Sequence, residues 1–336
     1  MTATLLPWLK LAACAVLIGI AGTMLAYYGD IIARLTGLSR TWIGLVLLAT
    51  ATSLPELFTS ISAVTVAAAP NIAVGDALGA CIFNLVILVV LDAMSREEPM
   101  YRRIDQGHIL SAGFGVILIG FVGVIVLLGR DNLDLRILHV SAYTPFVIVL
   151  YFVAIRAAFV YERRTKLEPQ IVAVEANMTL RMAVARYLLA AGVVGGAGTW
   201  LPFVGLELAE AMGWRTTFVG TLFVAAATTL PELVVTISAF RLGAVDMAIG
   251  NLLGSNLFDV LILAVADLAY VRGPLLAAVS PAHAISAFAA VIMSGVFIVA
   301  LLYRPETRFR GTIGWVSLSL LMIYLLSSYA IYLHGH

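Results

Sequence analysis

The sequence predicts an all-α integral membrane protein whose ten transmembrane helices form two inverted repeats of five. The first observation is composition, because 62% of the 336 residues are hydrophobic and only 12% are charged, whereas soluble domains carry about 25% charged residues. The second is that apolar runs of roughly 20 residues, enough to cross a bilayer as a helix, recur from end to end. The third is an internal duplication.

Charged and polar breaks divide the chain into ten apolar spans, and no segment between them is polar enough to form a separate soluble domain. The first run is longer than a signal-peptide core and has no basic leader or A-x-A cleavage site, so we expect it to remain as a helix. The predicted spans are 8–28, 41–67, 71–94, 107–128, 140–160, 184–208, 216–239, 246–270, 281–303 and 312–333.

The most polar connector, YERRTKLEPQ at residues 161–170, separates five spans from five. We therefore expect a first repeat at residues 1–165 and a second at 166–336, within one membrane domain. Lys and Arg favour the cytoplasmic side of a membrane. With the N-terminus outside, 15 of them fall inside and 5 outside. Both termini are therefore expected outside, and the short loops favour the inner membrane of a prokaryote.

The duplication is visible by direct alignment. The segment GLVLLATATSLPELFTSISA at 44–63 matches GTLFVAAATTLPELVVTISA at 220–239 at 11 of 20 positions, and GDALGACIFNLVIL at 75–88 matches GNLLGSNLFDVLIL at 250–263. Because five is an odd number of spans, the second half enters the membrane from the opposite side. The two copies of each motif are then related by an axis in the membrane plane and face each other near the midplane.

Each copy of the Thr-(Ser/Thr)-Leu-Pro-Glu motif gathers oxygen donors within one helical turn. Its proline removes a helical hydrogen bond and frees a carbonyl about one turn earlier. Carboxylate, hydroxyl and carbonyl oxygens are hard ligands that Ca²⁺ takes in groups of about six to eight, and that Mg²⁺ or Mn²⁺ also accept. Two facing copies therefore predict one shared cation site. Its side-chain donors are Thr52, Ser53, Glu56, Thr228, Thr229 and Glu232.

The second motif extends this site. Ser255 and Asp259 are four residues apart and share a helix face, while Gly250 and Gly254 permit close helix approach. The first copy has Asn84 where the second has Asp259. The predicted site is therefore duplicated without being symmetric.

An acid in a membrane protein is not always a ligand. Asp92 and Asp267, at the ends of spans 3 and 8, are expected to be solvated interfacial acids. By contrast, Glu56, Glu232 and Asp259 lie inside spans, where each charge costs about 2.5–3.5 kcal/mol. No Lys or Arg lies within either motif to pair with them. A mobile cation is therefore expected to compensate their charge.

At these residues the chain resembles the Ca²⁺/cation antiporter superfamily, most closely its Na⁺/Ca²⁺ exchanger branch. That family carries two inverted repeats with G-T-S-L-P-E followed by G-N-x-x-G-S-N-x-x-N/D, and the Pro-Glu pairs separate it from the H⁺/Ca²⁺ exchanger branch. The resemblance implies a secondary antiporter that exchanges Ca²⁺ for Na⁺ by alternating access. It implies no enzyme activity and no cofactor, because the two ions are the cargo.

The resemblance also implies a division of roles. Glu56 and Glu232 bridge the ions at the centre, and spans 1 and 6, with GIAGT and GGAGT, are similar to the family's sliding gate helices. The remaining implied ligands are the side chains of Thr52, Thr228, Ser255, Asn84 and Asp259 and the backbone carbonyls of Ala49 and Ala225.

Three departures from the family pattern affect what the resemblance implies. Ala51 and Ala227 replace glycine, a small change that we expect to be tolerated. Asp76 replaces asparagine, and either adds an acid to the site or lies at a helix end without a transport role. Ala80 and Cys81 replace a Ser-Asn pair and remove oxygen ligands from one Na⁺ position. An antiporter coupled to H⁺, or one for Mg²⁺ or Mn²⁺, therefore stays open.

Other classes of protein fit the sequence less well. A net charge of +1 with no basic face argues against nucleic acid, and the two cysteines show no zinc or redox spacing. An intramembrane enzyme would need a catalytic set, but H-E-x-x-H is absent and AVGD at 73–76 lacks the first glycine of G-x-G-D. Cation channels usually build their filter from several subunits around one axis. The expected partners are transported cations and membrane lipid, and a monomer is plausible.

Overall fold

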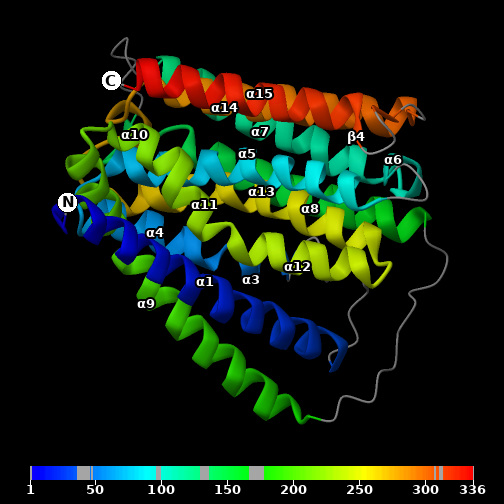
Figure 1. Cartoon of the computed structure of the whole chain (residues 1–336). Helices are drawn as coiled ribbons and strands as arrows, with labels where there is room; N and C mark the ends of the chain where they lie inside the picture. The colour runs from blue at the N-terminus through cyan, green and yellow to red at the C-terminus, as the bar shows by residue number, and fades with distance from the viewer. Residues whose placement is uncertain are drawn as a thin grey trace.

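The computed structural model describes residues 2–35, 46, 48–95, 100–128, 136–165, 178–305, 308–309 and 313–335. These residues form a bundle of long helices, which confirms the predicted all-α membrane fold (Figure 1). Within them, eight helices are long and apolar enough to cross a membrane, and one bent pair adds a ninth. The predicted span 41–67 lies partly outside the described residues, so the count of ten stays a prediction.

Seven predicted spans begin and end within a few residues of an observed helix or bent pair. The helices of spans 1 and 6 are longer than predicted at both ends. A short helix α6 (Met100–Arg103) and a 3₁₀ turn η4 (Leu275–Ala277) lie in connections. The spanning helices are α1 (Thr2–Leu35), α5 (Pro70–Met94), α7 (His108–Leu128), α8 (Thr144–Thr165), α9 (Leu180–Met212), α13 (Val245–Ala269), α14 (His283–Tyr303) and α15 (Trp315–His334).

Helices α5 and α13 form the centre of the bundle (Figure 1). Both are apolar around their whole circumference apart from a few small polar residues, which is the pattern of a helix buried on all sides. They pack against each other, and α7, α8, α14 and α15 surround them. The beginning of α1 and the end of α15 lie at the same end of the bundle. This placement suits an even number of membrane crossings.

Both copies of the proline motif break a helix. In the first repeat α3 (Ala49–Thr52) ends at Ser53 and α4 (Leu54–Thr65) follows. In the second repeat, the first piece consists of α10 (Thr216–Val219), the π-helix η3 (Gly220–Val224) and α11 (Ala225–Thr228), and it ends at Thr229. Helix α12 (Leu230–Arg241) follows after a bend of 44°. Each proline lies in the first turn of the second piece, where its missing N–H removes no hydrogen bond from that helix.

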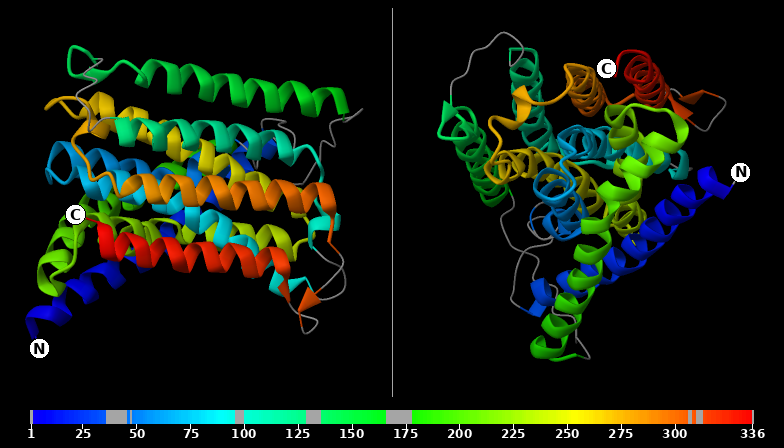
Figure 2. Two further views of the ribbon diagram at one scale, coloured as in Figure 1. Left: turned by 90° about the horizontal axis from the view of Figure 1, so that it is seen from above. Right: turned by 90° about the vertical axis from the view of Figure 1, so that its left-hand side faces the viewer.

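Helices α1 and α9 lie side by side and antiparallel on one side of the bundle (Figures 1 and 2). They have 34 and 33 residues, so each is about 50 Å long and must tilt to fit a bilayer. Lys10 Nζ pairs with both Glu207 carboxylate oxygens at 2.6 and 2.8 Å. Farther along the same pair, Arg186 donates to the Tyr28 hydroxyl at 3.3 Å.

Two short hairpins are the described departures from an all-α chain. Strands β1 (Arg136–Ile137) and β2 (Val140–Ser141) precede α8, and β3 (Arg308–Phe309) and β4 (Ile313–Gly314) precede α15. Each hairpin leads into the fifth helix of its repeat. The structural duplication therefore reaches the fifth span, beyond the three spans that the sequence alignment covers.

The prediction that Asp92 and Asp267 are solvated is wrong. Both side chains are at most 2% exposed, because the loop and first turn of a neighbouring helix surround each carboxylate with donors. The donors to Asp92 are Gly314 N and Ser317 Oγ, and those to Asp267 are Ser141 N, Ser141 Oγ, Thr144 Oγ1 and Leu275 N.

Candidate cation site

Four carboxylates meet where the broken helices cross α5 and α13. Glu56 and Glu232 begin α4 and α12, whereas Asp76 and Asp259 project from α5 and α13. All four are at most 1% exposed, and the charges of the other three act on Glu56. In the part of the chain that the structure describes, no ion pair with Lys, Arg or His involves any of them. We call these four residues the acidic centre.

The hydroxyl at each helix break binds the glutamate of the other repeat. Ser53 Oγ donates to Glu232 Oε1 at 3.0 Å, and Thr229 Oγ1 donates to Glu56 Oε1 at 3.4 Å. Since both helix breaks are made by the proline motif, the motif itself places the two glutamates against each other.

The preceding threonines cross between the repeats in the same way. Thr228 Oγ1 donates to Asp76 Oδ1 at 2.9 Å, and Thr52 Oγ1 lies 3.5 Å from Asn251 Oδ1. Asp76 is fully buried in the second turn of α5, which begins at Pro70. The alternative that Asp76 lies at a helix end is therefore wrong, because the helix starts earlier than that position and the side chain points into the bundle.

A third crossed pair joins α5 to α13. Asn84 Nδ2 donates to Asn256 Oδ1 at 3.0 Å, and the Cys81 thiol donates to Asp259 Oδ2 at 3.7 Å. In the aligned repeats Cys81 matches Asn256 and Asn84 matches Asp259. The contacts therefore come in three sets of two. Exchanging the two repeats turns one contact of each set into the other, as a two-fold axis through the acidic centre requires.

Several oxygens of this region are left without a hydrogen-bond partner. A buried polar atom without a partner costs about 1–3 kcal/mol, and native structures rarely leave several together. Their clustering on four acids and two neighbouring side chains indicates a place for a cation. Among the described residues these atoms are Glu56 Oε2, Glu232 Oε2, Asp76 Oδ2, Asp259 Oδ1, Ser255 Oγ and Asn84 Oδ1.

The donors are not drawn together into a closed cage. Within the described ranges, no three His, Cys, Asp or Glu side chains lie close enough to hold a metal ion. The Ala49 carbonyl already accepts from Ser53 N and the Ala225 carbonyl from Thr229 N. The hydroxyl oxygen of Thr52 lies 3.3 Å from the Ala49 carbonyl, and those of Thr228 and Thr229 lie 3.1 and 2.7 Å from the Ala225 carbonyl, so these carbonyls are alternative acceptors for the hydroxyl protons.

The predicted site residues therefore lie in one region of the bundle without forming a closed cage. Three further residues of this region were not predicted from the sequence. Asn251, Asn256 and Cys81 take part in the crossed pairs, although the sequence argument named only the loss of oxygen at Cys81. The alignment of the repeats held the signal, because Asn251 and Asn256 occupy the positions of Asp76 and Cys81 in the other copy.

Two equivalent glycines bring α1 and α9 against the broken helices. A Cβ added at Gly22 would lie 2.7 Å from Pro231 Cβ, and one added at Gly198 would lie 3.0 Å from the Pro55 carbonyl oxygen. Both prolines belong to the ion motif of the opposite repeat. The outer helices therefore contact the acidic centre's framework directly, and only a residue without a side chain fits there.

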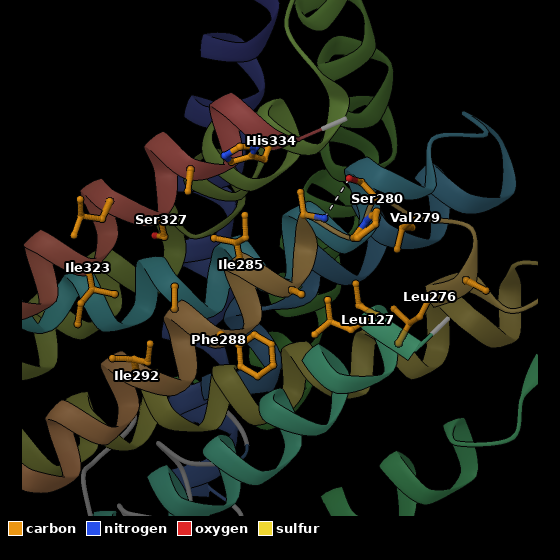
Figure 3. Close-up of a pocket in the computed structure, with 18 residues that line it drawn as sticks. Leu127, Leu276, Val279, Ser280, Ile285, Phe288, Ile292, Ile323, Ser327 and His334 are labelled. Carbon is orange, nitrogen blue, oxygen red and sulfur yellow. Dashed lines mark hydrogen bonds between the residues drawn. The ribbon is translucent and has the colours of Figure 1, made fainter. Parts of the chain in front are cut away.

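A groove of about 1030 Å³ lies away from the acidic centre, between α7, α14 and α15 (Figure 3). Its lining includes Leu127, Ile285, Phe288, Ile292 and Ile323 and no acid. Leu127 and Ile292 are about half exposed, as expected for side chains that face lipid. This groove is therefore not the cation site.

Inverted repeats with broken helices that place unpaired acids at the centre of a bundle define a class of membrane transport proteins. The chain belongs to the sodium/calcium exchanger family, whose model matches residues 6–161 and 182–333. The two matched segments follow the two halves of the fold.

Individual relatives agree with this membership. The structure of the sodium-calcium exchanger NCX_Mj soaked with Na⁺ and Sr²⁺ superposes with a TM-score of 0.63 at 22% identity, covering 96% of this chain and 98% of that one. The uncharacterized membrane protein MJ0091 of Methanocaldococcus jannaschii is 29% identical over 248 residues, 71% of this chain and 76% of that protein. The sodium/calcium exchanger MaX1 of Methanosarcina acetivorans is 49% identical over 63 residues, 18% of each chain.

Proposed function

We propose that this protein is a secondary antiporter that exchanges Ca²⁺ for Na⁺ across the membrane by alternating access. The observation that carries the proposal is the acidic centre, in which four buried carboxylates lie near one another and pair with no basic side chain of the described residues. Inside a membrane, a bound cation or a proton can compensate such carboxylates. The names of two relatives, MaX1 and NCX_Mj, support Na⁺ and Ca²⁺ as the ions.

The ligands in this proposal come from both repeats, so neither half holds an ion alone. Glu56 and Glu232 bind at the centre, and Asp76 and Asp259 bind on either side. Hydroxyl, amide and carbonyl oxygens complete the shell that Ca²⁺ needs. The proposed further ligands are Thr52, Ser53, Asn84, Thr228, Thr229, Ser255 and the carbonyls of Ala49 and Ala225.

Coupling then follows from competition. Ca²⁺ and Na⁺ need the same carboxylates, so occupancy by one excludes the other. An acidic centre without an ion is unfavourable while its carboxylates are charged, because like charges repel one another. Helices α1 and α9, which contact the broken helices through Gly22 and Gly198, would open the site to one side at a time.

The identity of the driving ion is the part of the proposal with a specific rival. Ala80 offers no side-chain oxygen, and the Cys81 thiol donates a hydrogen bond to Asp259. One Na⁺ position is weakened in this way, which favours an H⁺-coupled antiporter or one for Mg²⁺ or Mn²⁺ as the second candidate. The chain itself would remain a cation antiporter in each case.

We also propose that both termini face the outside and that the host is the inner membrane of a prokaryote. The excess of Lys and Arg on one side supports this orientation. Repeats at 1–165 and 166–336 in one monomer would be sufficient, since the acidic centre is built from a single chain.

Uptake of ⁴⁵Ca²⁺ into proteoliposomes tests the proposal. One set of vesicles is loaded with Na⁺, and a second set carries a pH gradient without Na⁺. Glu232→Gln removes one central carboxylate at constant size, and Glu210→Gln, at an exposed position near the end of α9, is the matched control.

We expect uptake only with internal Na⁺, its loss in Glu232→Gln and its retention in Glu210→Gln. Uptake driven by the pH gradient alone would instead show H⁺ coupling. If neither gradient drives Ca²⁺ while Mn²⁺ or Mg²⁺ is taken up, the divalent ion is not Ca²⁺.

A further inference from the structure

The acidic centre contains one ligand position that differs in chemistry from its two-fold equivalent. Where the second repeat has the amide of Asn256, the first has the thiol of Cys81. Asn256 and Cys81 each contact a residue of the opposite repeat, Asn84 and Asp259 respectively. The oxygen of an amide has thus been exchanged for a sulfur at a position that faces the proposed ion.

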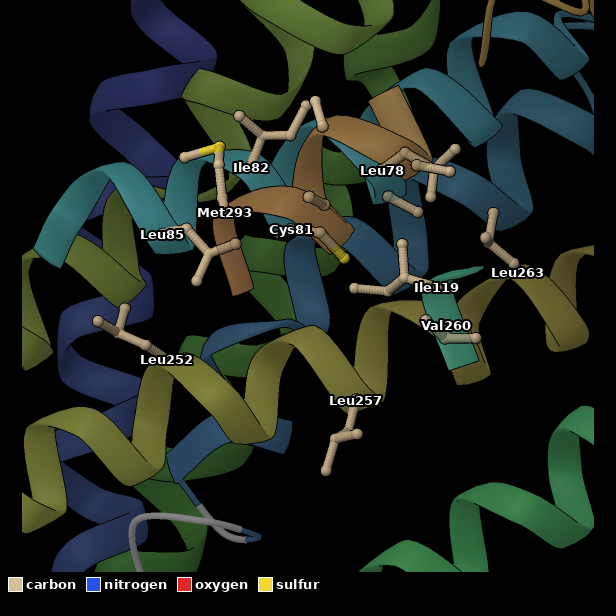
Figure 4. Close-up of a cluster of buried hydrophobic side chains, with 14 of the residues drawn as sticks. Leu78, Cys81, Ile82, Leu85, Ile119, Leu252, Leu257, Val260, Leu263 and Met293 are labelled. Atoms are coloured by element: carbon tan, nitrogen blue, oxygen red, sulfur yellow. The ribbon is translucent and has the colours of Figure 1, made fainter. Parts of the chain in front are cut away.

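The surroundings of Cys81 are polar on the side that faces α13. The sulfur lies 3.7 Å from Asp259 Oδ2 and 3.8 Å from the Asn256 carbonyl oxygen, and the thiol is fully buried. Figure 4 shows Cys81 on the side of α5 that faces α13, while Ile82 of the same helix points to the opposite side. Its immediate neighbour is therefore a carboxylate.

Independent of the thiol, oxygens beside it lack partners. Among the described residues, Asp259 Oδ1 and Glu56 Oε2 are buried without a hydrogen-bond partner, and the charge of Glu56 also acts on Cys81. A cation that bound the Asp259 carboxylate would also come close to the sulfur, because Asp259 Oδ2 lies 3.7 Å from it.

We propose that Cys81 is a sulfur ligand of the cation site and that the site therefore also binds a thiophilic divalent cation such as Cd²⁺ or Zn²⁺. This inference rests on the proposed function, because it assigns one more ligand to the same centre. Thiolate selects such ions, whereas carboxylate, carbonyl and water suit Ca²⁺ and Mg²⁺. As the metal–sulfur bond forms the S–H bond breaks, and the released proton leaves to the solvent.

A buried cysteine also acts as a small apolar residue, and the second cysteine of the chain provides that comparison. Cys14 and Cys81 are equally buried and both belong to the hydrophobic core, but of the two, Cys81 is the one whose sulfur contacts a carboxylate, that of Asp259. Cys14→Ala is therefore the matched control, and Cys81→Ala removes the proposed ligand.

The experiment titrates the purified full-length protein with CdCl₂ and records the sulfur-to-cadmium charge-transfer absorption. We expect a saturable band of equal size in the unmodified protein and in Cys14→Ala, and its loss in Cys81→Ala. Added Ca²⁺ should reduce the band, because both ions need Asp259 and Glu56. X-ray absorption at the cadmium edge of Cys14→Ala should show one sulfur among oxygen ligands, and this readout does not require Cys81→Ala to fold.

A band that persists in Cys81→Ala, a band lost in Cys14→Ala, or a cadmium shell of oxygen alone would each overturn the assignment. Failure of the proposed function looks different. A protein that shows the cadmium–sulfur band but no Ca²⁺ uptake under any gradient keeps the ligand and loses the antiport.

Discussion

At the scale of single residues, the acidic centre is organised by side chains that cross from one repeat to the other. Ser53 and Thr229 hold the opposite glutamates, and Thr228 holds Asp76. Each acid has one carboxylate oxygen that accepts a hydrogen bond and one that has no hydrogen-bond partner among the described residues. The bonded oxygen fixes the position of the side chain, and the free oxygen is available to an ion.

Asp76→Asn tests whether the fourth acid belongs to the site. The asparagine oxygen can still accept from Thr228 Oγ1, so the fold should be retained while one negative charge is lost. Because the affinity of oxygen sites for Ca²⁺ depends on ligand charge, we expect Ca²⁺ to bind roughly tenfold more weakly. Equilibrium ⁴⁵Ca²⁺ binding measures this. Asp105→Asn, in a connecting loop, is the control and should leave the affinity for Ca²⁺ unchanged. If Asp76→Asn also left that affinity unchanged, Asp76 would not be a ligand.

At the scale of elements, the outer helices and the terminal helices are attached to the core in different ways. Helices α1 and α9 touch the broken helices through glycines against prolines, and α9 also accepts hydrogen bonds from α4, from Thr59 Oγ1 to the Gly198 carbonyl at 3.2 Å and from Ser62 Oγ to the Thr199 carbonyl at 2.6 Å. Helices α8 and α15 are tied to α13 and α5 by Asp267 and Asp92. The outer pair is therefore held by close contacts and by hydrogen bonds to backbone carbonyls, whereas the terminal helices are held by buried carboxylates.

Gly22→Ala should disturb the contact between α1 and α12. Its Cβ would meet Pro231 Cβ at 2.7 Å, whereas a Cβ at Gly19, one turn earlier, would meet Leu230 at 3.7 Å, an ordinary contact. Overpacking costs about 1–3 kcal/mol, so we expect Gly22→Ala to lower the Tm in detergent and Gly19→Ala to leave it unchanged. Equal Tm values for the two variants would show that α1 does not pack as described.

Asp267→Ala should destabilise the protein more than Asp92→Ala. The first change leaves four buried donors without an acceptor and the second leaves two, and each unsatisfied donor costs about 1–3 kcal/mol. Thermal unfolding monitored by size-exclusion chromatography gives the order of Tm values. The reverse order, or no change in either variant, would contradict a structural role for these acids.

At the scale of the whole molecule, two halves of one chain build a single site that neither half contains. The sequence predicted this much, because the repeat of Glu56 at Glu232 and of Asn84 at Asp259 is visible by alignment. It did not predict the burial of Asp92 and Asp267, since their donors lie in short hairpins, the turn η4 and the first turns of α8 and α15, which give no periodic signal that relates them to either acid. The crossed contacts of Ser53 and Thr229 depend on how the halves are placed against each other, which local patterns do not encode.

The orientation of the whole chain is open to direct labelling. His334→Cys, at the exposed end of α15, should react with a membrane-impermeant thiol reagent added to intact cells, because both termini are expected outside. Arg241→Cys, exposed at the end of α12, should react only after permeabilisation. Both native cysteines are buried, so they can remain. The opposite pattern of labelling would invert the proposed orientation.

The central claim is that Ca²⁺ and Na⁺ exclude each other from one buried acidic centre. Equilibrium binding of ⁴⁵Ca²⁺ to the purified protein at increasing Na⁺ tests it most directly, with Glu56→Gln measured in parallel. We expect Na⁺ to raise the apparent Kd for Ca²⁺ without lowering the number of sites, and Glu56→Gln to weaken Ca²⁺ binding by more than roughly tenfold. Binding that is indifferent to Na⁺, or that survives Glu56→Gln unchanged, would contradict a shared site and with it this explanation of exchange.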